Sequence, residues 1–85
     1  MYYLKEELIY NQISKEIVIK TQQDNATIFL NETASVIFKA IADGKDIKDE
    51  IIKKYALKNE ELEIISADVQ EVLNNLTELG VIYEG

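Results

Sequence analysis

Apolar and polar positions alternate along the first third of the chain. Residues 7–13 (ELIYNQI) and 16–21 (EIVIKT) are rich in Ile, Val and Tyr and alternate roughly in polarity, which predicts two β-strands. Ser14-Lys15 separates them at hairpin distance, although tight hairpin turns usually contain Gly or Asn. A turn at residues 22–25, where Asp and Asn tolerate a left-handed backbone, leads to a third short strand at 26–30 (ATIFL). Three strands joined by short turns favour an antiparallel meander.

The period of the pattern becomes helical after residue 31. Apolar residues return at spacings i, i+3, i+4 and i+7, which places them on one face of a helix over residues 32–43: Ala34, Ile37, Phe38 and Ile41. Asn31 is suited to be its N-cap, because its side chain can accept from a backbone N–H one turn in. Gly44 is suited to follow the last turn as the C′ residue. The third strand therefore runs directly into this helix.

Two further helices are predicted. The first covers residues 47–56, is capped by Asp46, and has an apolar stripe of Ile47, Ile51 and Tyr55. The second begins at a cap on Asn59 and runs to Leu79, where Gly80 ends it, for a length of about 30 Å. Its predicted buried stripe consists of Leu62, Ile65, Val69, Val72, Leu73, Leu76 and Leu79.

The order of elements is thus βββααα, which predicts an α+β fold in a single domain over residues 1–85. A sheet with one apolar face needs cover, and the three amphipathic helices supply it. The last two helices beside a small sheet resemble a winged helix-turn-helix arrangement. Tyr2 and Tyr3 are expected to pack on the sheet, and residues 81–85 (VIYEG) to add a short strand or simply pack.

The composition of the chain limits the chemistry that its side chains can perform. The 85 residues include no Cys and no His, so thiolate metal sites, disulfides and the usual nucleophile–base pairs are excluded. We expect no catalytic site, metal or cofactor. The start of the chain has no signal-peptide pattern and no apolar stretch is long enough to span a membrane, which favours a cytoplasmic protein with no membrane contact.

The net charge of −7 is concentrated at one end. All nine lysines lie in residues 1–58 beside nine acids, whereas residues 59–85 carry seven acids and no base. The third helix would be the recognition helix of a winged-helix protein, but a DNA-reading helix needs Lys or Arg to neutralise phosphates. Its acidity argues against nucleic-acid binding.

The third predicted strand is the candidate binding element. Residues 26–30 contain no Lys or Pro of the kind that usually protects an exposed sheet edge. Two interpretations stay open at this point. The strand is central or is covered by the tail or by a second copy of the chain, or its edge accepts an extended peptide as an added strand.

Several short motifs lie at a characteristic spacing along the chain. They are the segments LNETA (30–34), ADGKDIKDEI (42–51), ADV (67–69) and LGVI (79–82), together with Ile37, Phe38, Tyr55, Leu73 and Leu76. In combination they resemble the PqqD family, the small peptide-recognition domains (RiPP recognition elements) of ribosomal natural-product biosynthesis. The resemblance covers about residues 6–83.

The resemblance implies a winged-helix-like module that has no catalysis of its own and binds the leader of a precursor peptide. The leader would pair with the third strand, in a groove against the third helix. The peptide-binding residues that it implies are Thr27, Ile28, Phe29, Leu30, Ile65, Asp68, Val69, Val72 and Leu76. The module would present the precursor to a modifying enzyme such as a radical-SAM maturase. A leader protease fits less well, because residues 25–29 (NATIF) lack the aromatic, glycine-containing strand common in lasso-peptide systems.

Two other function classes remain as alternatives to peptide capture. One is a transcriptional regulator of winged-helix type, which the charge of the third helix disfavours. The other is a structural subunit that uses the same edge strand to form a homodimer.

Overall fold

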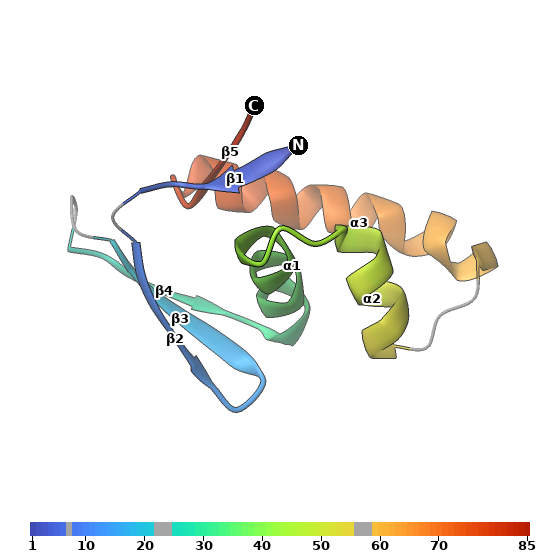
Figure 1. Ribbon diagram of the computed structural model, residues 1–85, viewed down its shortest axis with the longest axis horizontal. Helices are drawn as coiled ribbons and strands as arrows, with labels where there is room; N and C mark the ends of the chain where they lie inside the picture. The colour runs from blue at the N-terminus through green and yellow to red at the C-terminus, as the bar shows by residue number, and fades with distance from the viewer. Residues whose placement is uncertain (7, 22–24, 56–58) are drawn as a thin grey trace.

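The computed structural model describes residues 1–6, 8–21, 25–55 and 59–85 (Figure 1). The elements in chain order are β1 (Tyr2–Leu4), β2 (Leu8–Ile13), β3 (Glu16–Thr21), β4 (Thr27–Leu30), α1 (Glu32–Ala42), α2 (Ile47–Tyr55), α3 (Asn59–Glu78) and β5 (Ile82–Glu84). Within these ranges, no helix is long and apolar enough to cross a membrane.

Strands β2, β3 and β4 form the predicted antiparallel meander. Their order in the sheet is β2-β3-β4, with Ile13 opposite Glu16 at the hairpin and Ile17 opposite Leu30 at the end of β4. This sheet, followed by three helices, confirms the α+β, winged-helix-like prediction. Glu7, with which the first strand was expected to begin, lies outside the described residues.

Both turns of the meander use a left-handed residue that is not glycine. Ser14, the first residue of the two-residue β2–β3 turn, has φ 58°, and Asn25, before β4, has φ 51°. Asn tolerates this conformation better than most residues, as expected for the second turn, whereas Ser does so less readily. The hairpin therefore stores backbone strain at Ser14.

The passage from β4 into α1 is fixed by Asn31, as predicted. Its backbone is extended (φ −71°, ψ 178°) and its Oδ1 accepts a hydrogen bond of 2.8 Å from the N–H of Ala34. At the other end of α1, Gly44 has φ 69° and donates to Ile41, while Lys45 donates to Ala40. This pair of bonds is a Schellman C-cap, so both predicted ends of the helix are confirmed.

A buried hydroxyl joins the sheet to α1. Ser35 is only 3% exposed; its Oγ accepts from the N–H of Ile17 at 2.8 Å and donates to the carbonyl of Leu30 at 3.3 Å. Ile17 and Leu30 are opposite each other on β3 and β4. One side chain of the helix thereby satisfies backbone groups of two neighbouring strands.

Helix α2 begins at Ile47, as predicted, and α3 ends one residue before the predicted Leu79. Residue 56, where the second helix was predicted to end, lies outside the described residues. Asp46 caps α2, since its Oδ1 accepts from the N–H of Asp49 at 3.1 Å. Helix α3 begins at Asn59. The predicted N-cap by the Asn59 side chain and the predicted burial of Leu62 stay predictions, because both side chains lie outside the described part of the chain. Tyr55, expected in the apolar stripe of α2, is 37% exposed.

The prediction that Leu79 is buried was wrong. Leu79 is 52% exposed, whereas Val81 is fully buried. Helix α3 ends at Glu78, and Gly80, with φ 76°, reverses the chain direction in a second Schellman cap. The reversal turns Val81 into the core in place of Leu79.

The two ends of the chain form a second, two-stranded sheet that the sequence did not predict. β1 pairs antiparallel with β5, Tyr3 opposite Tyr83, and these two rings lie 5.6 Å apart. The N-terminal tyrosines therefore pair with the tail instead of packing on the three-stranded sheet, which corrects that expectation. Figure 1 shows the N- and C-termini side by side.

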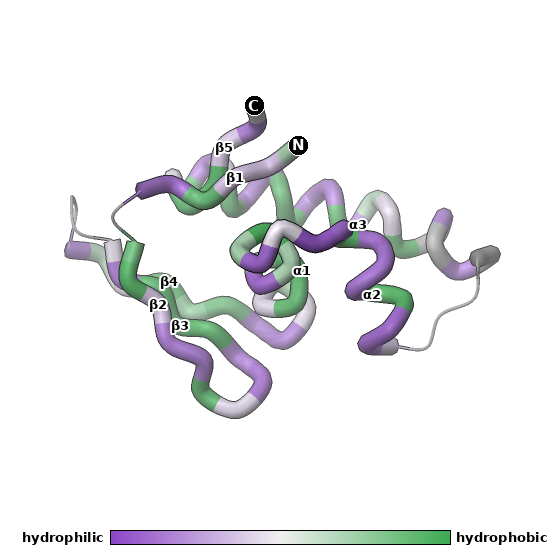
Figure 2. The backbone as a smooth tube through the Cα atoms, viewed as in Figure 1, coloured by the Kyte–Doolittle hydropathy of each residue, from purple (hydrophilic) through white to green (hydrophobic). Residues whose placement is uncertain are grey.

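Helix α1 is the centre of the packing. It contacts β1, β3, β4, α2 and α3, and its Phe38 and Ile37 are fully buried. The ring of Phe38 meets Tyr10 of β2 edge to face at 4.9 Å. Figure 2 shows hydrophobic stretches along β3, β4 and α1. The sheet, α2 and α3 are thus held in place through a single buried helix.

The Ser35 bridge predicts a large cost for a small change. Ser35→Ala leaves a buried N–H and a buried carbonyl without their partner, so the free energy of unfolding should fall by about 2–4 kcal/mol. Urea unfolding followed by circular dichroism measures it. Ser66→Ala, at an exposed hydroxyl bonded to the carbonyl of Glu63, is the control and should change stability by less than about 0.5 kcal/mol. Equal stabilities of the two variants would contradict the bridge.

The strain at Ser14 predicts a stabilising substitution. Ser14→Gly should raise the free energy of unfolding by about 0.5–1 kcal/mol, because glycine adopts a positive φ without steric conflict. The midpoint of thermal unfolding should rise by a few degrees. Lys15→Gly, at the neighbouring turn residue, is the control and should not stabilise. A loss of stability in Ser14→Gly would show that the turn is unstrained.

Candidate functional site

Strand β4 is an edge of the three-stranded sheet. It pairs with β3 on one side, and among the described residues no strand pairs with its other side. The alternative in which this strand is central is thereby removed. The C-terminal tail does not cover the edge either, because β5 pairs with β1.

The hydrogen-bond parity of the sheet decides which backbone groups of β4 point outward. The N–H of Thr21 donates to the carbonyl of Ala26 at 3.0 Å, so these two residues form a hydrogen-bonded pair. The N–H of Ile17 points toward β4 as well: it donates to the hydroxyl of Ser35, which donates in turn to the carbonyl of Leu30. In an antiparallel ladder these pairs alternate, so Ile28 also faces β3. The N–H and carbonyl groups of Thr27 and Phe29 therefore point away from the sheet.

Side chains of β4 alternate across the sheet in the same way. Ile28 is half-buried and Leu30 is 5% exposed, on the face that packs against the helices. Thr27 and Phe29 are exposed on the opposite face. The four predicted residues of this strand thus divide into two that support the core and two that lie on the outer face at the free edge.

The predicted residues of α3 also lie on two flanks. Val72 is half-buried and Asp68, four residues before it, is exposed, so the two lie on the same flank of the helix. The exposed Leu79, seven residues after Val72 and just beyond the end of α3, continues this flank. Leu76 is 2% exposed and belongs, with Leu30, to the hydrophobic core. The helix α1 touches both α3 and β4, so it sets the separation of the strand from the helix.

Ile65 and Val69 line a separate apolar cleft. This cleft, of about 930 Å³, lies between α3, the start of α2 and the N-terminal strand, with Leu73, Ile47 and Tyr2 among its lining residues. Both side chains are half-buried. The structure therefore brings Ile65 and Val69 together on the flank of α3 that carries Ser66 and Gln70, whereas Asp68 and Val72 lie on the other flank.

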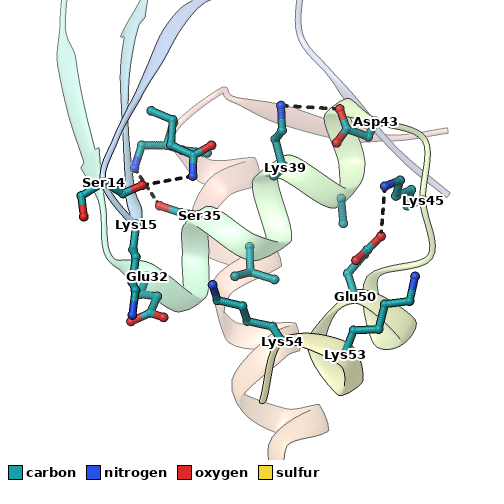
Figure 3. A pocket seen from close by; sticks show the side chains of 14 residues that line it. Ser14, Lys15, Glu32, Ser35, Lys39, Asp43, Lys45, Glu50, Lys53 and Lys54 are labelled. Carbon is teal, nitrogen blue, oxygen red and sulfur yellow. Dashed lines mark hydrogen bonds and ion pairs between the residues drawn. The ribbon is translucent and has the colours of Figure 1, made fainter. Parts of the chain in front are cut away.

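A lysine-rich cleft was not anticipated from the sequence. It has a volume of about 440 Å³ between the β2–β3 turn, α1 and α2. Its charged lining residues are Lys15, Lys39, Lys45, Lys53, Lys54, Glu32, Asp43 and Glu50. Two lysines form ion pairs on the rim, Lys39 with Asp43 at 3.7 Å and Lys45 with Glu50 at 3.6 Å, and Lys15 points toward Glu32 (Figure 3). The concentration of lysines in residues 1–58 was the only signal for this cleft.

The acids of α3 face solvent. Glu61, Glu63, Asp68, Glu71 and Glu78 are all exposed, and within the described part of the chain none of them forms an ion pair. The helix contains no Lys or Arg to offset them. The molecule is therefore electrostatically two-sided, with a lysine-rich cleft beside α1 and α2 and an acidic third helix.

The described part of the chain offers surfaces suited to binding. It contains no Cys or His, and the described residues contain no group of three acidic side chains placed to hold a metal ion. A free strand edge suits main-chain recognition of an extended segment. The chemical means available to this site are backbone pairing, apolar contact and charge.

Comparison with known proteins connects this geometry to a family. The family described as "Coenzyme PQQ synthesis protein D (PqqD)" matches residues 16–82. A solved structure described as "TbiB1 in Complex with the TbiA(beta) Leader Peptide" has a similar fold, with a TM-score of 0.79 and 20% sequence identity over 98% of this chain and 99% of that chain. No curated protein matches the sequence.

Proposed function

The chain belongs to the PqqD family, and from this we propose that it captures the leader of a ribosomally made precursor peptide by strand addition to β4. The leader extends the β2-β3-β4 sheet by one strand and lies between β4 and α3. The module then presents the precursor to a modifying enzyme. Its proposed role is binding alone, and its side chains include neither Cys nor His.

The free edge of β4 is the observation that carries this proposal. Thr27 and Phe29 each present an N–H and a carbonyl away from β3. An antiparallel leader strand pairs with these groups whatever its side chains are, so affinity comes largely from the main chain. The likeness of the fold to TbiB1, which was solved in complex with a leader peptide, supports leader binding by this chain.

Helix α3 forms the second wall of the proposed groove. Ile28 and Val72 supply apolar surface that is only half-buried in the free chain. Leu30 and Leu76 support this surface from within the core. Asp68 adds a negative charge beside it. Ile65 and Val69 line the cleft on the other flank of α3 and lie outside this wall.

The partner enzyme is proposed to be a radical-SAM maturase in preference to a leader protease. The segment before Leu30 reads NATIF and contains no glycine, unlike the aromatic, glycine-containing strand of lasso-peptide systems. Co-purification of this chain with any radical-SAM enzyme encoded near its gene, in the presence and absence of the leader, tests the pairing. Association with a neighbouring protease alone would overturn the preference.

Titration with a synthetic leader tests the central claim. The peptide is the leader of the precursor encoded beside this chain's gene, and binding is followed by calorimetry and by ¹⁵N–¹H NMR. Amide shifts should concentrate on residues 27–30 and on the flank of α3 that carries Asp68 and Val72. Absence of binding by any leader encoded nearby would sink the proposal.

Proline substitution separates the two faces of the strand. Phe29→Pro removes an N–H that points outward, so the protein should remain folded and bind the leader at least about tenfold more weakly. Ile28→Pro removes an N–H that faces β3, so it should destabilise the fold itself. Circular dichroism measures folding and calorimetry measures binding.

Phe29→Ala is the matched control for the proline variant, because it removes the same side chain and keeps the N–H. It should bind more tightly than Phe29→Pro. Equal binding by the two variants would mean that the N–H of Phe29 makes no hydrogen bond to the leader. Loss of folding in Phe29→Pro would mean that the parity assigned to β4 is wrong.

The acidic helix predicts a salt-dependent affinity. A leader that carries Lys or Arg near α3 should bind more weakly as salt is raised from low to moderate concentration, because screening reduces the attraction. Asp68→Asn should weaken binding about two- to fivefold at low salt, the usual range for one exposed charge pair. The difference from the wild type should shrink at high salt.

Glu63→Gln is the control for this measurement. Glu63 lies on the same helix but lines the cleft on the opposite flank, so its effect should be smaller than that of Asp68→Asn. If the leader affinity does not change with salt and is the same in Asp68→Asn as in the wild type, the role of charge is refuted and strand addition still stands.

A further inference from the structure

Phe29 is a large aromatic side chain left in water at the edge of the sheet. Its side chain is 76% exposed, more than Ile13 at 64% or Ile9 at 51% on the same outer face. The half-buried Val18 lies directly opposite it on β3. Among the described residues, nothing flanks the ring on the side away from β3, because β4 is the last strand.

A strand added to β4 places one of its side chains in this vacant position. Phe29 belongs to the pairs that exchange hydrogen bonds with the added strand, and directly opposed residues point to the same face of a sheet. The peptide residue opposite Phe29 therefore stands beside the ring on the outer face. Its Cβ lies about 5 Å from that of Phe29, within contact range.

The neighbouring peptide residues meet different surroundings. Those one position away point to the inner face, toward Ile28 and the helices. The residue opposite Thr27 returns to the outer face, where its neighbours are Thr27 and Lys20, both polar. Only one outward position of the peptide thus meets an aromatic ring.

We propose that Phe29 is a specificity-determining residue that selects peptides with an aromatic or branched aliphatic side chain at the position opposite it. The inference rests on the proposed strand addition and names the class of peptide that this edge prefers. Such cross-strand pairs are the favoured partners of an aromatic residue in a sheet. The peptide is then read on both faces, outward by Phe29 and inward by the groove.

A displayed library of random twelve-residue peptides tests the inference without knowledge of the natural leader. The library is selected in parallel against the wild type, Phe29→Thr and Ile9→Thr. Threonine keeps the backbone N–H and favours strands, so Phe29→Thr retains strand addition. Ile9 lies on the same face but on β2, two strands away from β4 at the opposite edge of the sheet, which makes Ile9→Thr the matched control.

Peptides selected by the wild type should share one position that is aromatic or branched aliphatic. The residues on either side of this position should vary independently of it. This preference should disappear in the selection against Phe29→Thr and persist against Ile9→Thr. A selected peptide should bind Phe29→Thr about two- to fivefold more weakly than the wild type, the range expected for one cross-strand pair. Replacing the shared residue by Ser should cost the wild type the same factor and cost Phe29→Thr nothing further.

The outcomes distinguish this inference from the proposed function. An unchanged preference in the Phe29→Thr selection overturns the role of Phe29 and leaves strand addition standing. Additive losses from the two substitutions overturn it equally. If the wild type enriches no peptides that shift the amides of residues 27–30, strand addition fails and the role of Phe29 fails with it.

Discussion

The hydroxyl of Ser35 is the contact on which the arrangement of strand and helix depends. It hydrogen-bonds to the N–H of Ile17 and to the carbonyl of Leu30 from the face of the sheet that packs against α1. Asn31 caps α1 one residue beyond Leu30, so the orientation of the start of the helix relative to the end of β4 is fixed. Because α1 also contacts α3, the distance between the edge strand and the acidic helix is set inside the core. A groove between them would be formed before any peptide arrives, which lowers the entropy cost of binding.

The elements that the sequence predicted are those whose signals are local. Asn31, Asp46, Gly44 and Gly80 act within one helical turn of their own positions, and all four helix ends appear where these residues predicted them. The pairing of β1 with β5 joins residues about eighty positions apart. Three-residue strands carry almost no periodic signal, so only the folded chain reveals that the two ends meet.

The binding edge was predictable as a segment but not in its orientation. Residues 26–30 read as a strand from composition, yet the direction of each N–H depends on the register with β3. That register places Ile17 opposite Leu30 and Lys20 opposite Thr27, and the alternation of apolar and polar residues alone does not fix it in advance. Leu79 shows the same limit, because helical spacing assigned it to the core and the reversal at Gly80 replaced it with Val81.

The direct junction of β4 and α1 also bears on aggregation. An apolar strand edge left open to solvent is a template for uncontrolled pairing between chains. Segments that stack into cross-β fibrils generally need six or seven consecutive extended residues. Asn31 ends β4 after four residues and commits the following ones to a helix. At β4 the chain thus keeps an edge that is long enough to hold a peptide and shorter than a fibril-forming segment.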